Sequence, residues 1–182
     1  MQGFVNFAFD VGNVLSTLIP LFCYIFGVSM FLAAGYGAWN CTKPGNYWER
    51  HKPLIALELL IGSILVSFDQ FLNFSNGTFG GDVSTSVAAG ATSYTPPTVN
   101  AADLIGSTPE QTITNLITDF SYFFTAYGAF ICYLAVMSLR AVGQGRRNHG
   151  ISLPLIMLVF GISLMNIQTL TTTIMGYFNT PA

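Results

Sequence analysis

Long stretches without charge are the feature that most constrains how this chain folds. No charged residue lies between Asp10 and Lys43, and none lies between Ile151 and Phe178. Only 8% of the 182 residues are charged, whereas about 25% are charged in an ordinary soluble domain. So few charges cannot cover a domain of this size with a water-facing surface. This composition excludes an ordinary soluble enzyme, a nucleic-acid-binding protein and a disordered linker.

Four stretches of the sequence are long and apolar enough to cross a membrane. A helix needs about 20 mostly apolar residues to span roughly 30 Å of hydrocarbon. Because a spanning backbone must satisfy its own hydrogen bonds, uninterrupted apolar runs of this length cross as helices. We therefore predict an all-α membrane protein with four transmembrane helices, over residues 14–39, 53–74, 120–139 and 151–178.

The basic residues indicate the direction of these helices. All six Lys and Arg residues fall in two short segments, residues 40–52 and 140–150. The positive-inside rule places both segments in the cytoplasm. Both termini and the segment 75–108, which is rich in Ser, Thr, Gly and Pro, are then expected on the outer side.

The predicted spans form two tandem hairpins, residues 1–74 and 109–182. Each returning helix begins with Pro-Leu-Ile, at Pro53 and at Pro154, and a glycine follows nine and seven residues later, respectively. An internal duplication and a coincidence among apolar helices both account for this pattern.

The helix that opens the second hairpin is expected to begin before the membrane. Thr108 is placed to act as its N-cap, with Pro109 as the first helical residue. A helix from Pro109 to residue 139 would project several turns beyond the bilayer. The projecting part is polar, so we expect it to pack on a partner or to face solvent.

Two carboxylates lie in the second predicted span. Glu58, Gly62 and Asp69 are separated by four and seven residues, which places them on one face of a continuous helix. A carboxylate at membrane depth costs about 2.5–3.5 kcal/mol on insertion scales. Both can lie near the interfaces, with Glu58 reaching Lys52 or Arg50; they can also form a polar contact between subunits, or line a proton or ion pathway.

Small and polar residues follow one face of each helix in the second hairpin. Gly128 and Cys132 share a face of the third predicted span, and Asn166, Thr169 and Thr173 share a face of the fourth. In lipid, small residues let helices approach closely, and polar side chains hydrogen-bond across helices. We expect these residues to pack the bundle or to form contacts in an oligomer.

The sequence offers no chemistry of catalysis. It contains no nucleophile elbow, no phosphate-binding loop after a strand and no zinc-ligand spacing around His51 or His149. The three cysteines lie in spans or at the cytoplasmic edge, so they form no disulfide framework. We expect neither an enzyme nor a bound cofactor or metal.

The chain from Tyr122 to Phe178 resembles a known family. It combines an aromatic and glycine-containing helix, a turn rich in Arg, Gly and His, and a last helix with Gly and Asn. The residues that carry the resemblance are Tyr127, Gly128, Phe130, Tyr133, Arg140–Gly150, Pro154, Gly161, Asn166 and Gly176–Phe178. This pattern is similar to that of DotE/IcmC, small inner-membrane proteins of Dot/Icm type IVB secretion systems, and of TraQ from related conjugative plasmids.

The resemblance implies a bacterial inner-membrane protein. It assigns no functional residue to this sequence. We expect a structural subunit of a type IVB secretion or conjugative transfer apparatus. It would assemble by helix–helix contacts, with copies of itself or with other membrane subunits, and help to translocate protein or DNA. The alternative is a small ion or solute permease that uses Glu58 and Asp69. A eukaryotic four-span surface protein is a weaker third hypothesis, because the outer segment lacks cysteine pairs.

Overall fold

The structure, a computed structural model, describes residues 2–78, 109–146 and 150–178, and these residues are mostly helical. No strand occurs within these ranges, which confirms the prediction of an all-α chain. Most of the outer segment 75–108, including Thr108, and part of the segment 140–150 lie outside the described residues. In chain order the helices are α1 (Gln2–Asn40), α2 (Tyr47–Arg50), α3 (Lys52–Val66), α4 (Phe68–Thr78), α6 (Pro109–Asp119), α7 (Ser121–Gly143), α8 (Ser152–Met165) and α9 (Ile167–Phe178).

Two of these helices are long and apolar enough to cross a membrane on their own. α1 has 39 residues and α7 has 23; at 1.5 Å per residue α1 is about 58 Å long. α3 and α8 have only 15 and 14 residues, and each continues into another helix after a sharp bend. The described part of the chain therefore contains two candidate spans, or four if each bent pair crosses the membrane as one span.

The bends correct the predicted course of two spans. α3 meets α4 at 86°, and α8 meets α9 at 81°. The stretches 53–74 and 151–178 are therefore not continuous helices, and this part of the sequence prediction was wrong. The helix expected from Pro109 to residue 139 does begin at Pro109, but it is interrupted at Phe120 between α6 and α7.

Each interruption is confined to one residue whose backbone groups stay hydrogen-bonded. Ser67 donates its N–H to Ser63 O at 3.0 Å and accepts from the N–H of Phe71 at 3.0 Å. The same pattern, with partners four residues back and four residues ahead, holds at Phe120 and Asn166. Ser and Asn are weak formers of helix interiors. Because hydrocarbon offers no water to replace lost backbone bonds, these hinges permit a sharp bend without exposing unpaired groups at the bend residue.

The two hairpins are built on the same close helix crossing. α1 and α3 meet at Gly27 and Gly62, where a Cβ added to Gly62 would lie 3.2 Å from the carbonyl oxygen of Gly27. α7 and α8 meet at Gly128 and Gly161, where a Cβ on Gly128 would lie 2.6 Å from the carbonyl oxygen of Gly161. In each hairpin the bend comes five residues after the second glycine. This shared geometry supports the internal duplication that the Pro and Gly spacing left open.

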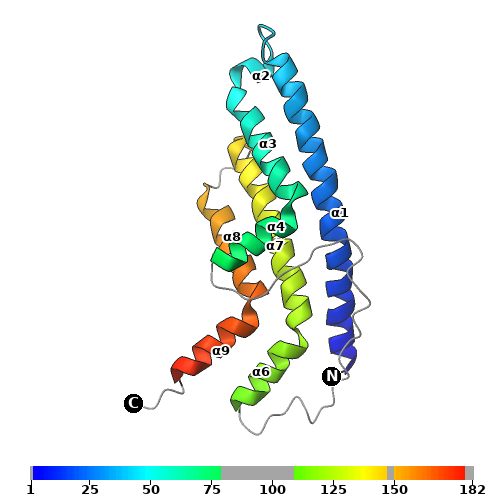
Figure 1. Cartoon of the computed structure of the whole chain (residues 1–182), viewed down its shortest axis with the longest axis vertical. Coiled ribbons are helices and arrows are strands. Elements are labelled where there is room, and N and C mark those ends of the chain that lie inside the picture. Colours follow the sequence, from blue (N-terminus) through cyan, green and yellow to red (C-terminus); the bar gives the residue numbers. More distant parts are fainter. Residues whose placement is uncertain (1, 79–108, 147–149, 179–182) are drawn as a thin grey trace.

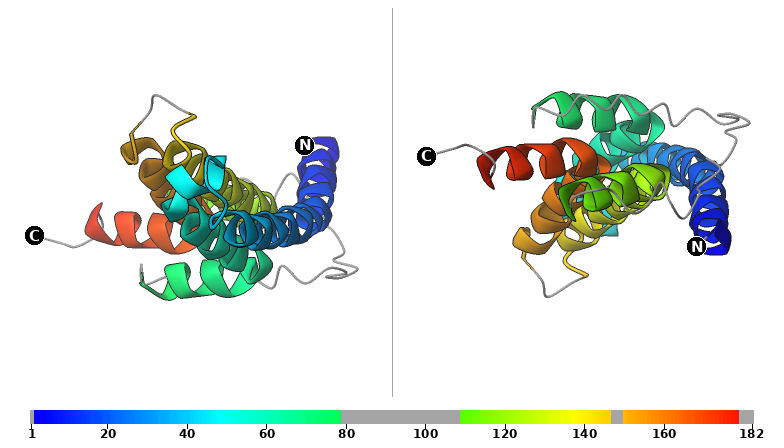
Figure 2. Two further views of the ribbon diagram at one scale, coloured as in Figure 1. Left: turned by 90° about the horizontal axis from the view of Figure 1, so that it is seen from above. Right: turned by 90° about the horizontal axis from the view of Figure 1, so that it is seen from below.

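The hairpins lie side by side and point the same way. α1 and α7 run in one direction, and α2 lies at the opposite end of the molecule from α6 and α9 (Figure 1). Figures 1 and 2 show that α4 and α9 turn away from the long axis toward the same side. Apolar side chains from both hairpins fill the core between them, among them Met30, Ile61, Leu65 and Cys132.

The glycine crossing predicts a specific sensitivity to one methyl group. Gly128→Ala places a Cβ against the backbone of α8, so we expect the free energy of unfolding to fall by about 1–3 kcal/mol, the usual cost of overpacking. Gly35→Ala is the matched control, because Gly35 lies in α1 and a Cβ there would meet nothing within 4 Å. Unfolding in mild detergent, followed by circular dichroism, measures both variants. Equal stability of the two would contradict the crossing.

Candidate functional site

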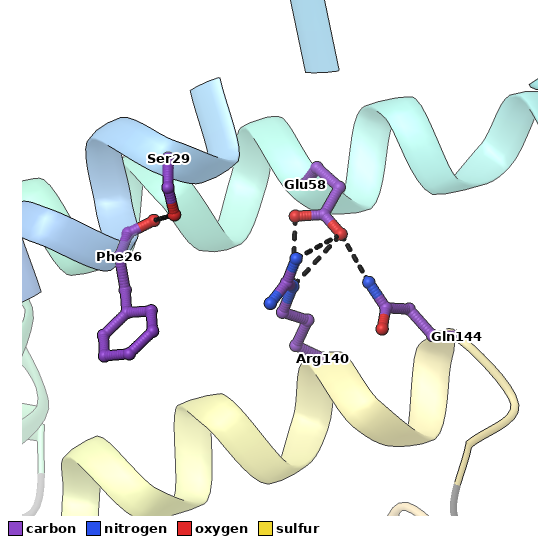
Figure 3. A network of polar contacts seen from close by, with 5 residues as sticks. All are labelled: Phe26, Ser29, Glu58, Arg140 and Gln144. Carbon is purple, nitrogen blue, oxygen red and sulfur yellow. Dashed lines mark hydrogen bonds and ion pairs between the residues drawn. The ribbon is translucent and has the colours of Figure 1, made fainter. Parts of the chain in front are cut away.

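Glu58, whose charge has a high free-energy cost of burial in the bundle, accepts hydrogen bonds from two residues of the other hairpin. Glu58 in α3 is a charged residue that is only 2% exposed. Arg140 donates from Nε to Oε1 and Oε2, at 3.1 Å each, and from Nη2 to Oε1 at 3.0 Å. Gln144 donates from Nε2 to Oε1 at 2.5 Å. Figure 3 shows that the side chains of Arg140, in α7, and of Gln144, the C-cap of α7, point at Glu58. We call Glu58, Arg140 and Gln144 the Glu58 cluster.

The end of α7 is shaped so that both donors reach α3. A Cβ on Gly143 would lie 2.4 Å from Leu57 Cδ2, so the absence of a side chain at Gly143 lets α7 approach α3 directly beside Glu58. Gly145 then ends the helix with φ +67°, a left-handed conformation that glycine adopts without steric cost. Its N–H bonds to Val142 O at 2.9 Å, and the N–H of Arg146 bonds to Ala141 O at 3.0 Å, which is a Schellman motif.

This pairing corrects the sequence expectation for Glu58. Its partners are Arg140 and Gln144 and not Lys52 or Arg50. The side chain of Arg140 is 25% exposed, so the ion pair joins a buried carboxylate to a partly exposed guanidinium. A buried carboxylate whose two oxygens already accept charge-assisted hydrogen bonds is stabilised in place by these donors. The arrangement holds two hairpins together.

Asp69 does not join Glu58 on a shared helix face. Glu58 and Gly62 are buried in α3, whereas Asp69 lies in the first turn of α4, beyond the bend at Ser67, and is exposed. A carboxylate in the first turn of a helix is favoured by the helix dipole. The prediction that Glu58 and Asp69 share one face of a continuous helix is therefore wrong.

A second polar contact joins α4 to the bend between α8 and α9. Asn166, the residue between α8 and α9, donates from Nδ2 to Asn76 Oδ1 of α4 and to Ile162 O. Asn76 is 1% exposed and Asn166 is 8% exposed. Asn166 Oδ1 is buried without a hydrogen-bond partner among the described residues, so the pair keeps one acceptor unused. Like the Glu58 cluster, this contact links the first hairpin to the second.

The other predicted site residues serve packing or bond within their own helix. Gly62 and Gly128 are at the two crossings, and a Cβ on Gly161 would lie 2.6 Å from the thiol of Cys132, which is fully buried. Thr173 is exposed and donates to the carbonyl oxygen of Thr169 at 2.8 Å. The face predicted for Asn166, Thr169 and Thr173 is divided by the bend, and for Thr173 the expected cross-helix bond is replaced by one within α9.

Besides the pairing of Arg140 with Glu58, three residues of the site were missed in the sequence analysis. Gln144 follows Arg140 by one helical turn, and this spacing at the end of a span is a signal for two donors on one face. Gly143 follows from the same segment only once a close approach to α3 is known. Asn76 gave no signal, since its burial depends on the bend that carries α4 across the bundle.

Within the described ranges no group of three or more His, Cys, Asp or Glu side chains is placed to hold a metal ion. Cys23, Cys41 and Cys132 are free thiols. Comparison of the chain with protein families, with curated proteins and with solved structures finds no match.

The Glu58 cluster predicts a rescue by an apolar pair. Arg140→Met leaves the buried carboxylate uncompensated, and we expect the free energy of unfolding to fall by about 3–5 kcal/mol. Adding Glu58→Met removes that charge, so the double variant should regain most of the loss, to within about 1 kcal/mol of the natural chain. Denaturant titration in mild detergent measures both. A double variant no more stable than Arg140→Met would contradict the pairing.

The contact between Asn76 and Asn166 predicts a smaller loss of stability. Asn166→Ala removes two buried hydrogen bonds, and we expect a loss of about 1–3 kcal/mol in the same measurement. Ser163→Ala is the control, because Ser163 Oγ bonds only to Val159 O of its own helix, at 2.8 Å, and its loss should stay within about 0.5 kcal/mol. The prediction fails if both variants unfold alike.

Proposed function

We propose that this protein is a structural membrane subunit of a type IVB secretion or conjugative transfer apparatus. In this role it crosses the bacterial inner membrane four times, with each bent helix pair as one span. Both termini and the segment 75–108 lie in the periplasm. It assembles with copies of itself or with other membrane subunits and thereby helps to translocate protein or DNA. The resemblance of the chain from Tyr122 to Phe178 to DotE/IcmC and TraQ supports this role.

The observation that carries the proposal is the state of the Glu58 carboxylate. A transported ion or proton needs a carboxylate that is open to it, but both oxygens of Glu58 accept hydrogen bonds from Arg140 or Gln144. The charge that is most expensive to insert in a membrane is used here to fix the relative position of two hairpins. A rigid two-hairpin unit suits a scaffold whose function depends on its shape.

The outward faces of the helices provide the surfaces for assembly. α1 and α8 expose large apolar side chains along their length, including Leu32 (71%), Ile156 (64%) and Phe160 (57%). Such surfaces face lipid or the helices of neighbouring subunits. The basic residues Lys43, Arg50 and Lys52 gather at the α2 end of the first hairpin, which supports a cytoplasmic position for that end.

The double variant that replaces Glu58 and Arg140 by methionine tests this function in the source bacterium. Deletion of the gene should lower DNA or protein transfer at least 100-fold, and the natural gene should restore it. With Arg140→Met, transfer should fall in proportion to the amount of the protein that is lost from the membrane. Glu58→Met with Arg140→Met should restore both protein level and transfer, because a scaffold needs the packing and not the charge.

Two outcomes contradict the proposal. The double variant can accumulate normally and still not support transfer, which would assign a transport role to the Glu58 charge. Alternatively, the natural protein, extracted in gentle detergent, can run in native mass spectrometry as a monomer with no other subunit bound, which would exclude a scaffold held by helix–helix contacts.

A further inference from the structure

An apolar cavity that is partly open to the outside lies between the first turns of α1 and the junction of α6 and α7. Its volume is about 540 Å³, and only apolar side chains line it. Five of them are phenylalanines: Phe4, Phe7, Phe120, Phe123 and Phe124. The α1 side and the α6–α7 side of the cavity meet at one edge, where the ring centroids of Phe4 and Phe120 lie 5.5 Å apart.

Water is not a suitable occupant of this cavity. A buried water needs two to four polar partners, and an engineered apolar cavity of about 150 Å³ stays dry and binds benzene or xenon. This cavity is more than three times larger and offers no polar side chain among its lining residues. An apolar occupant therefore suits this cavity better than water does.

A helix from another protein also fits poorly. One helical turn, about 10 Å wide and 5.4 Å long, occupies roughly 420 Å³, so the cavity holds little more than a single turn. Helices in membranes approach one another over small residues, whereas phenylalanines dominate this lining and Ala8 is its one small residue. A flexible chain of methylene groups enters between such rings more readily.

The cavity is continuous with the apolar outer surface of α1. Phe4 is 65% exposed and Phe7 is 63% exposed at its rim, and exposed apolar residues continue along α1 through Val14 and Leu21. α1 is a candidate membrane span from Gly3 to Asn40, so the part of this surface that lies in the bilayer meets lipid chains. We propose that the cavity is a binding site for one acyl chain of a membrane lipid, held between α1 and the α6–α7 junction. This inference is independent of the proposed transfer function.

Filling the cavity with a side chain tests the proposal. Ala8, which is 6% exposed, lines the cavity, so Ala8→Trp should displace the acyl chain. Ala38→Trp is the matched control, since Ala38 is an exposed residue near the other end of α1. Native mass spectrometry of the full chain in mild detergent should show a bound phospholipid on the natural protein and on Ala38→Trp, and at least fivefold less on Ala8→Trp.

A second measurement covers the case in which Ala8→Trp does not fold. The natural protein in excess mild detergent is mixed with one equivalent of a phosphatidylcholine that carries a diazirine near the end of one acyl chain, and is then irradiated. Labelled peptides should come predominantly from residues 4–8 and 116–124. Even labelling along all exposed apolar helices, cross-linking of this region to another polypeptide, or equal lipid retention by a folded Ala8→Trp variant would overturn the proposal.

Discussion

One buried carboxylate sets the relation between the two halves of this molecule. Glu58 lies in the interior of a bundle that offers little other polar surface, and an unpaired charge there would be strongly destabilising. Arg140 and Gln144 meet it only when the end of α7 lies against the middle of α3. The ion pair therefore favours one arrangement of the hairpins over others that bury similar apolar area. In a membrane, where hydrophobicity does not distinguish a helix neighbour from lipid, such a contact gives specificity.

The remaining structure is organised around repeated local features. Each hairpin is closed by a glycine-to-glycine crossing and then bends at a residue, Ser67 or Asn166, whose backbone groups keep their helical bonds. The bends turn α4 and α9 away from the long axis toward the same side, and α4 thereby brings Asn76 of the first hairpin to Asn166 of the second. Further along, the hydroxyl of Tyr122 in α7 donates to Ser16 in α1 at 3.0 Å. Contacts between the hairpins are thus spread along the bundle, with the charged one at the end of α7.

The sequence predicts the helical class and the apolar stretches well, because hydrogen-bond satisfaction in lipid leaves few alternatives. It also identifies Glu58, because a carboxylate at membrane depth has a high free-energy cost of insertion. It does not identify the partner, since Arg140 lies 82 residues away and the pairing depends on how α3 and α7 pack. The bends are not evident from the sequence for a related reason. Serine and asparagine also pack or hydrogen-bond within membrane helices, so only tertiary contacts decide whether the chain turns at Ser67 and Asn166. The exposed position of Asp69 is a consequence of that turn.

The most direct test of the α3–α7 contact is a disulfide between the hairpins in native membranes. Leu57 Cγ lies 3.4 Å from the position of a Cβ on Gly143, which suits a disulfide between Leu57→Cys and Gly143→Cys once the three native cysteines are replaced. A protease site inserted within residues 79–108 separates the hairpins after oxidation. We predict that the two fragments stay joined until a reductant is added, while Leu57→Cys with Gly176→Cys gives separate fragments. Separate fragments from the first pair under the same oxidation would contradict the account.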